Sequence, residues 1–503
     1  MADPPAGGFG ELREALHGER TRGGFARVVE ALREGFGADA EEARRVLMPY
    51  AQAALEAWPD EARSLEVDSS GFGGESVREW LEVSRGLRVV TPKRGSHDRA
   101  RDAAWAAEAV AWIASAPELS GLRRLDLSRQ RLTPAGAKVL AKAQNLGSLQ
   151  DLDVSATRAQ SLGLQALTRA PFARGLERLV ARSSRVNVAG FQSVAESTRA
   201  LVDLDLSYNP ARGGLRLLAR SEHLDALVRL DVSSTQANDE DLYALGASTG
   251  LGALRCLDLS GNRLFGPTAS DAFACAPWLS RLEELRFQRS GHGARDRSAW
   301  FEAAADMKGL RALALEGVGA STASIEAFAG APLDALRRLE LGLSDVTVEQ
   351  SRALCGAAWI SNLERLSFTG VPLDEVSTHA LAERVRSSRL GRLTLWDAEV
   401  DDAQGVALLR ACAQAGVREV ALGSARLGDA FARGVAALDL KGLRVLNLRA
   451  SAFGVEAIRE LAGATSLSGL EELRLSADLS DEARRVIAAS KTLSPVVRRR
   501  HGR

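Results

Sequence analysis

The segment LRRLDLS at residues 122–128 decides the fold, because close variants of it return along most of the chain. The next copies are LQDLDVS at residues 149–155 and LERLVAR at residues 176–182, and the last is LEELRLS at residues 470–476. Fourteen copies follow one another at intervals of 25 to 28 residues. Self-similarity at such a period is typical of repeat proteins, so we expect the copies to stack as one extended array.

Each copy predicts one short strand followed by one helix. Apolar residues two apart in LxxLxL give a strand with one buried face. The following stretch is helical, with Thr133 as its N-cap and Pro134 in its first turn. The same capping pattern recurs at Asn238, Thr347, Asp401 and Ser480. One such unit cannot close a core alone, so stacked units predict parallel strands on one side and helices on the other.

These copies resemble the leucine-rich repeats of the ribonuclease-inhibitor-like superfamily, over about residues 120–490. The resemblance implies an α/β fold: a right-handed solenoid (horseshoe) with parallel concave strands and convex helices. Two segments before it, residues 62–68 and 87–92, fit the strand pattern poorly. The ninth consensus position, usually Asn or Cys, is Asn only at Asn209 and Asn262. It becomes apolar in later copies, so the backbone of those turns needs other hydrogen-bond partners. These later residues are Val318, Val371, Ala398 and Ala425.

The sequence predicts four segments. Residues 1–58 form amphipathic helices, either as an N-terminal cap on the first repeat or as a docking segment for another protein. Residues 59–121 hold irregular first repeats with an inserted polar loop at residues 93–102, which is either solvated or a contact loop. The fourteen repeats occupy residues 122–490, and residues 491–503 form a basic tail that we expect to be frayed.

Composition limits the class of protein. The chain has 503 residues, 46% of them hydrophobic, and 65 basic residues balance 65 acidic ones. A neutral chain without a long apolar run does not favour nucleic acid or a membrane as a partner. The first residues lack a secretory pattern, which favours a cytoplasmic protein. Arginine outnumbers lysine by 59 to six in an Ala- and Gly-rich chain, which indicates a bacterial origin.

The sequence contains no catalytic or metal-binding motif that we recognise. The six histidines and four cysteines are scattered singly, with no metal-ligand spacing and no phosphate-binding glycine loop. We expect the four cysteines to be buried thiols. The sequence therefore predicts a non-enzymatic protein without a cofactor or metal. The alternative is an enzyme with its site in residues 1–120.

The third, fifth and seventh positions of LxxLxLx point away from the leucine core by strand alternation. We call these positions columns three, five and seven. Column five is rich in aspartate in the early copies, and column three carries arginine in three successive later copies, with a tryptophan close by in column seven. These candidate partner-binding residues are Asp126, Asp153, Asp205, Asp231, Asp258, Arg338, Arg365, Arg392 and Trp396.

The function predicted from these columns is a scaffold that binds a partner protein on its concave face, since exposed tryptophan beside arginine is typical of interface hot spots. The alternative is a regulatory sensor, an inhibitor or a protease target in a bacterial signalling or defence pathway. The sequence does not identify the partner or the oligomeric state.

Overall fold

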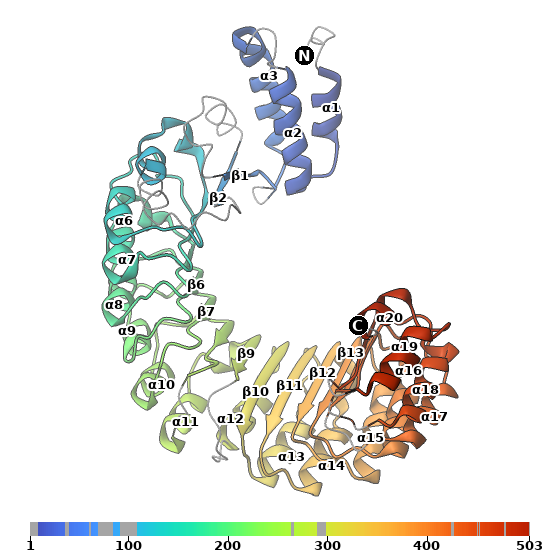
Figure 1. Cartoon of the computed structure of the whole chain (residues 1–503). Coiled ribbons are helices and arrows are strands. Elements are labelled where there is room, and N and C mark those ends of the chain that lie inside the picture. The colour runs from blue at the N-terminus through green and yellow to red at the C-terminus, as the bar shows by residue number, and fades with distance from the viewer. Residues whose placement is uncertain are drawn as a thin grey trace. The chain divides into compact units, whose positions relative to one another are not determined.

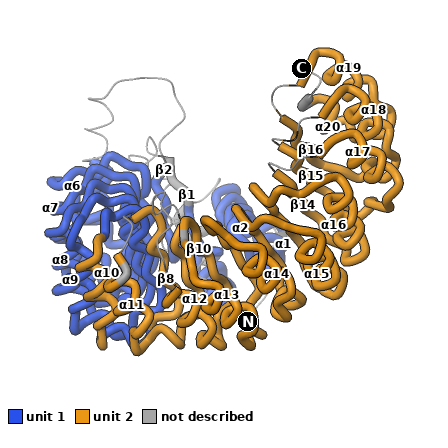
Figure 2. The backbone as a smooth tube through the Cα atoms, turned by 90° about the horizontal axis from the view of Figure 1, so that it is seen from below, with its two compact units in different colours: residues 1–237, 250–253 blue, residues 238–249, 254–503 orange. Residues whose placement is uncertain are grey.

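The computed structural model separates the chain into two compact units (Figure 2). Unit 1 holds Met1–Ala237 and Gly250–Ala253, and unit 2 holds Asn238–Thr249 and Leu254–Arg503. The structure describes residues 9–35, 40–59, 62–68, 84–90, 108–262, 266–288, 298–423, 427–449, 451, 453–476 and 479–501. In each unit the strands are parallel and follow one another in chain order, as the repeat predicts.

Within its described residues, unit 1 begins with three helices and continues with seven strands. The helices are α1 (Phe9–His17), α2 (Arg22–Gly35) and α3 (Ala40–Leu55). The strands are β1 (Ser64–Asp68), β2 (Gly86–Val90), β3 (Arg124–Asp126), β4 (Asp151–Asp153), β5 (Arg178–Val180), β6 (Asp203–Asp205) and β7 (Arg229–Asp231). The repeat helices stack side by side along these strands (Figure 1). They are α6 (Pro134–Leu140), α7 (Gln160–Thr168), α8 (Val188–Ser197) and α9 (Gly214–Ala219), with short 3-10 helices at Pro117–Gly121 and Pro171–Gly175.

The described part of unit 2 holds nine strands with helices packed along one side of them (Figure 1). The strands are β8 (Cys256–Asp258), β9 (Glu284–Phe287), β10 (Ala312–Val318), β11 (Arg338–Leu343), β12 (Arg365–Thr369), β13 (Arg392–Trp396), β14 (Glu419–Gly423), β15 (Val445–Asn447) and β16 (Glu472–Arg474). The helices are α10 (Asp239–Gly246), α11 (Pro267–Ala274), α12 (Ser298–Ala305), α13 (Thr322–Gly330), α14 (Val348–Gly356), α15 (Glu375–Arg386), α16 (Asp402–Ala415), α17 (Asp429–Ala436), α18 (Val455–Gly463), α19 (Asp481–Ala489) and α20 (Pro495–His501). Short 3-10 helices lie at Leu279–Arg281, Ala358–Asn362 and Thr465–Leu467.

The fourteen predicted strands are confirmed as β3 to β16. Two further strands, β1 and β2, form at the copies that fit the pattern poorly, and both pair in parallel with the strands that follow. The repeat leucines stack in register; Leu257, for example, is paired with Leu285 of the next strand. Leu254, Leu257 and Leu259 are at most 2% exposed. The core is therefore a continuous column of leucines within each unit.

The predicted helix caps are also confirmed. The side chain of Thr133 accepts a hydrogen bond from the backbone N–H of Gly136, and Pro134 lies in the first turn. Asn238, Thr347 and Asp401 each form a capping box with a residue three positions further on. The Ser480 side chain accepts from the N–H of Ala483. Each cap satisfies an N–H that has no partner within its helix.

The backbone groups in the turns after the strands find hydrogen-bond partners in two ways. In unit 1 the buried Asn209 side chain donates to the carbonyls of Ala181 and Leu206 at 2.8 and 2.9 Å, and accepts from two backbone N–H groups. In unit 2 the ninth residue is apolar and buried at Val371 and Ala398, and the strands of these two repeats, β12 and β13, are five residues long instead of three or four. In these longer strands, backbone groups form hydrogen bonds with the neighbouring strand, whereas in other repeats a polar ninth side chain such as Asn209 is their partner.

Two expectations differ from the structure. The basic tail is not frayed through residue 501, because α20 packs on α19 and β16 with Val497 buried. The cysteines are not all buried: Cys275 is exposed and Cys256 is partly exposed. Cys275 ends a helix on the surface, and Cys256 lies in column three. Cys355 and Cys412 are buried as expected, and burial raises the pKa of both thiols to about 12.

The N-terminal helices form a core of their own that reaches the first strand. Leu12, Phe25 and Leu32 are at most 1% exposed, and Leu65 of β1 packs against this cluster. The prediction that residues 1–58 are helical therefore agrees with α1 to α3. That they act as a cap remains a prediction, which their contact with β1 favours.

We predict that Leu257→Asp unfolds unit 2, because it places an unpaired carboxylate in the leucine column. The expected loss exceeds about 4 kcal/mol of unfolding free energy. Urea denaturation followed by circular dichroism measures it. The matched control is Leu162→Asp on α7, whose side chain is 58% exposed and whose replacement should cost less than about 1 kcal/mol. Equal stability of the two variants would contradict the register.

We also predict that deleting residues 1–58 causes aggregation, because it uncovers Leu65 and the free edge of β1. Size-exclusion chromatography with light scattering detects the change. A truncated protein that stays monomeric with native stability would show that the segment is a docking module and not a cap.

Candidate functional site

Columns three, five and seven form the strand surface that the helices leave open, which we call the open strand face. Along β11 the pattern alternates: Leu339 and Leu341 are buried, whereas Arg338 and Glu340 are partly exposed or exposed. Strand alternation produces this pattern in both units. Large and charged side chains on this face are therefore available to a partner unless they bind one another.

In unit 1, column three is an ion-pair ladder. Arg124 lies 2.7 Å from Asp151, and Arg178 lies 3.2 Å from Asp151 and 3.1 Å from Asp203. These residues are register neighbours on β3 to β6, so opposite charges face each other at every step. This part of the face is internally neutralised. The sequence analysis did not single out this ladder, although the alternation of Arg and Asp in column three could have revealed it.

The predicted column-five aspartates hold the turns that follow their strands. Each accepts a hydrogen bond of 2.8 to 2.9 Å from the backbone N–H two residues further on. Asp126 is the register neighbour of Asp153, and Asp205 that of Asp231, while Val180 separates the two pairs. Burial raises the pKa of Asp153 against the opposing effect of its hydrogen bond from Ser155. These carboxylates thus have a structural task, and partner binding by them, including Asp258 in unit 2, stays a prediction.

The predicted arginine stack is in register. Arg338 pairs with Arg365, and Arg365 with Arg392, on adjacent strands. However, the ends of the stack are not free: Arg338 lies 2.7 Å from Glu284, and Arg392 binds Glu419 on the next strand. Within the part of the chain that the structure describes, Arg365 has no ion pair. Most of the repulsion expected between the three guanidinium groups is therefore already relieved.

Arg338 reaches Glu284 across an intervening strand. Glu284 is on β9, and β10 between them carries the small residue Ala312. In the same way the side chain of Gln288, the residue after β9, donates a 2.7 Å hydrogen bond to Glu340 on β11. Both alanines of β10 on this face, Ala312 and Ala314, are buried beneath these side chains. Local sequence gives no signal of such pairs, since the partners are more than 50 residues apart.

Trp396 borders a depression of about 510 Å³ on the open strand face of unit 2. Its ring lies over Gly423 of β14: a Cβ atom on Gly423 would be 2.0 Å from Trp396 Cε3. Small and polar side chains line the depression between Trp396 and the last two strands. The lining includes Arg392, Thr394, Glu419, Ala421, Val445, Asn447, Glu472 and Arg474. The structure therefore joins two predicted residues, Arg392 and Trp396, to a hollow that sequence analysis did not anticipate.

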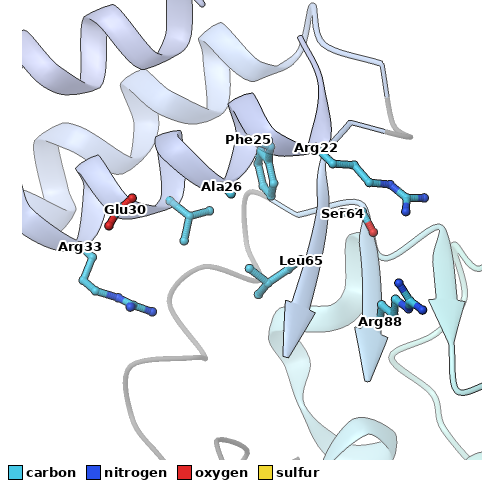
Figure 3. A pocket seen from close by; sticks show the side chains of 10 residues that line it. Arg22, Phe25, Ala26, Glu30, Arg33, Ser64, Leu65 and Arg88 are labelled. Atoms are coloured by element: carbon cyan, nitrogen blue, oxygen red, sulfur yellow. The ribbon is translucent and has the colours of Figure 1, made fainter. Parts of the chain in front are cut away.

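A second hollow of about 470 Å³ lies between α2 and the first strands (Figure 3). Phe25, Ala26 and Leu65 supply apolar surface, and Arg22 and Arg88 lie toward one end of it. Arg88 is already paired with Asp126 at 3.3 Å. Residues 93–102, for which the sequence predicts a solvated or contact loop, lie outside the described residues.

Among the described residues, no three His, Cys, Asp or Glu side chains are placed to hold a metal ion. In that same part of the chain, no helix has the length and apolarity needed to cross a membrane.

The repeated strand and helix define a leucine-rich-repeat fold in both units. No family model and no curated protein matches the chain. Among solved structures, an internalin (InlF) of Listeria monocytogenes is similar to it at 15% sequence identity, with a TM-score of 0.39. That match covers 88% of this chain and 95% of the internalin chain.

We predict that two aspartates of the ion-pair ladder in unit 1, Asp151 and Asp203, contribute unequally to the free energy of unfolding. Asp151 forms ion pairs with two arginines and its side chain is 11% exposed, whereas Asp203 is 28% exposed and forms one such pair among the described residues. Asp151→Ala should cost about 1–2 kcal/mol and Asp203→Ala less than about 1 kcal/mol. Urea denaturation at low salt compares them, and the reverse order would contradict the ladder.

Proposed function

We propose that the protein is a non-enzymatic scaffold that binds a partner protein on the open strand face, with the centre of the contact on unit 2 at Trp396. The observation that carries this proposal is the partly exposed Trp396 side chain at the rim of a depression, with arginines beside it. Tryptophan and arginine are enriched among residues that dominate interface energies.

The ring is also held in place before a partner arrives. Gly423 leaves the space that the ring fills, so Trp396 lies against β14 and does not need to be ordered on binding. A pre-ordered aromatic side chain offers a large contact area at a small entropic cost. The strand scaffold beneath it is rigid, because Leu393 and Leu395 on either side of Thr394 are buried.

The same face of unit 1 is a weaker candidate. Its column-three charges are paired with one another, and its column-five aspartates are bound to backbone N–H groups. A partner there would have to compete with these interactions. We place the protein in the cytoplasm of a bacterium, in keeping with its composition, and assign it no cofactor.

The test begins with affinity capture from the native host, using the wild-type protein and Trp396→Ala side by side. We expect a protein that is retained by the wild type and lost from the variant. With that partner purified, Trp396→Ala should weaken binding by roughly 2 kcal/mol or more in isothermal titration calorimetry. The matched control is Tyr243→Ala, which removes an exposed aromatic residue from helix α10. Equal losses for both variants would overturn the proposed surface.

Replacing Arg338, Arg365 and Arg392 together with glutamine should slow association and flatten its salt dependence, with dissociation less affected. Stopped-flow measurements at several salt concentrations follow the association rate. If this variant and Trp396→Ala both bind natively, the contact lies elsewhere, and the aspartate columns of unit 1 become the surface to test.

A further inference from the structure

The arginines near Trp396 that are available to a partner differ from the three that the sequence predicts, which are Arg338, Arg365 and Arg392. From β12 to β16, columns three, five and seven carry four arginines and two glutamates. Arg392 binds Glu419, and Arg474 binds Glu472 at 2.7 Å. Of the described residues in these columns, Arg365 and Arg449 are left without an ion pair, and both are exposed.

Neither arginine is among the residues that line the depression, and by strand order and column the two flank it. Arg365 is in column three of β12, whereas Arg449 is in column seven of the repeat that contains β15. Three strand spacings of roughly 4.8 Å and four residues of roughly 3.3 Å place their Cα atoms about 20 Å apart. The diagonal between them passes over column five of β13 and β14, where Thr394 and Ala421 line the depression.

The floor along this diagonal suits a peptide main chain. Ala421 and Val445 are small enough to let a backbone approach, and Trp396 forms an apolar wall beside them. Thr394 and Asn447 bring hydrogen-bonding groups to the same hollow. The Asn447 Oδ1 atom accepts from the Arg449 N–H at 3.2 Å, which fixes the side chain next to that arginine.

We propose that this depression recognises an extended acidic segment of the partner, whose carboxylates pair with Arg365 and Arg449 and whose apolar centre packs against Trp396. An extended chain advances about 3.3 Å per residue, so the two carboxylates are about six residues apart. Guanidinium groups favour carboxylates because two parallel N–H groups match two oxygens. This inference rests on the proposed function and specifies the chemistry of its partner.

Gly423 is a positioning residue in this surface. Its backbone is not in the left-handed region, so alanine is compatible with the strand, but the new Cβ atom would collide with the Trp396 ring. The ring must then leave its seat on β14. Gly423→Ala therefore disturbs the apolar wall without removing either arginine.

The test titrates the full-length protein with three capped seven-residue peptides that share a Ser-Val-Leu-Val-Ser centre and carry glutamate, glutamine or lysine at both ends. Fluorescence anisotropy gives each affinity. Fluorine NMR of fluorotryptophan-labelled protein reports on the ring, with the Trp396 signal identified among the eight tryptophans by Trp396→Phe. Exposed ion pairs contribute about threefold each, so the glutamate peptide should bind about tenfold more tightly than the glutamine peptide at low salt.

Arg365→Gln and Arg449→Gln should each reduce that preference about threefold, while Arg286→Gln, on β9 of the same face, should leave it unchanged. Gly423→Ala should shift the Trp396 signal and weaken the glutamate and glutamine peptides alike, which preserves their ratio. Such a result separates the positioning role of Gly423 from a charge effect.

Equal affinities for the three peptides, binding to none of them, or a preference that survives both arginine substitutions would overturn the inference. The proposed function is tested separately, by whether Trp396→Ala still retains the captured partner. If that partner is lost from Trp396→Ala while the glutamate peptide has no advantage, the binding surface stands and the acidic segment is wrong.

Discussion

Every other feature of this protein depends on the stacking of leucines between neighbouring repeats. A repeat of about 27 residues has one strand and one helix, too little to enclose a core. Leu257 is shielded from water because Leu285 lies beside it in register and helices cover the other side. Burial of each leucine therefore requires the next repeat, and the backbone register that this imposes sets the positions of all side chains on the opposite face.

That register creates the electrostatics of the open strand face. Because strand neighbours hold the same position in successive repeats, an alternation of Arg and Asp along column three becomes a chain of contacts through Asp151. A run of arginines in column three instead becomes a stack of like charges, which can form ion pairs only with carboxylates at other positions. Glu284 and Glu419 supply them at the two ends, and Arg365 in the middle keeps its charge open to solvent. Charged side chains are thus available to a partner at the places where they form no ion pair within the open strand face.

The same constraint explains why small residues matter on this face. Ala312 lets Arg338 reach an acid two strands away, and Gly423 gives Trp396 a surface on which to lie. In both cases a missing side chain on one strand decides where the large side chain of another strand goes. The recognition surface is therefore a property of several neighbouring repeats together and of no single one.

The sequence by itself determined the repeat, the strand and helix of each copy, the caps at Thr133 and Asn238, and the membership of each column. It could do so because these features depend on neighbours within one period or at one constant spacing. Only the tertiary structure decided that Arg338 is paired, that Trp396 covers Gly423, and that β10 to β14 are longer than the other strands of the repeats. Those outcomes depend on which side chains meet across two or three strands, where long side chains choose among several partners at similar distance. The local sequence pattern carries no information on the partner of a long side chain, because packing against neighbouring strands decides which partner it contacts.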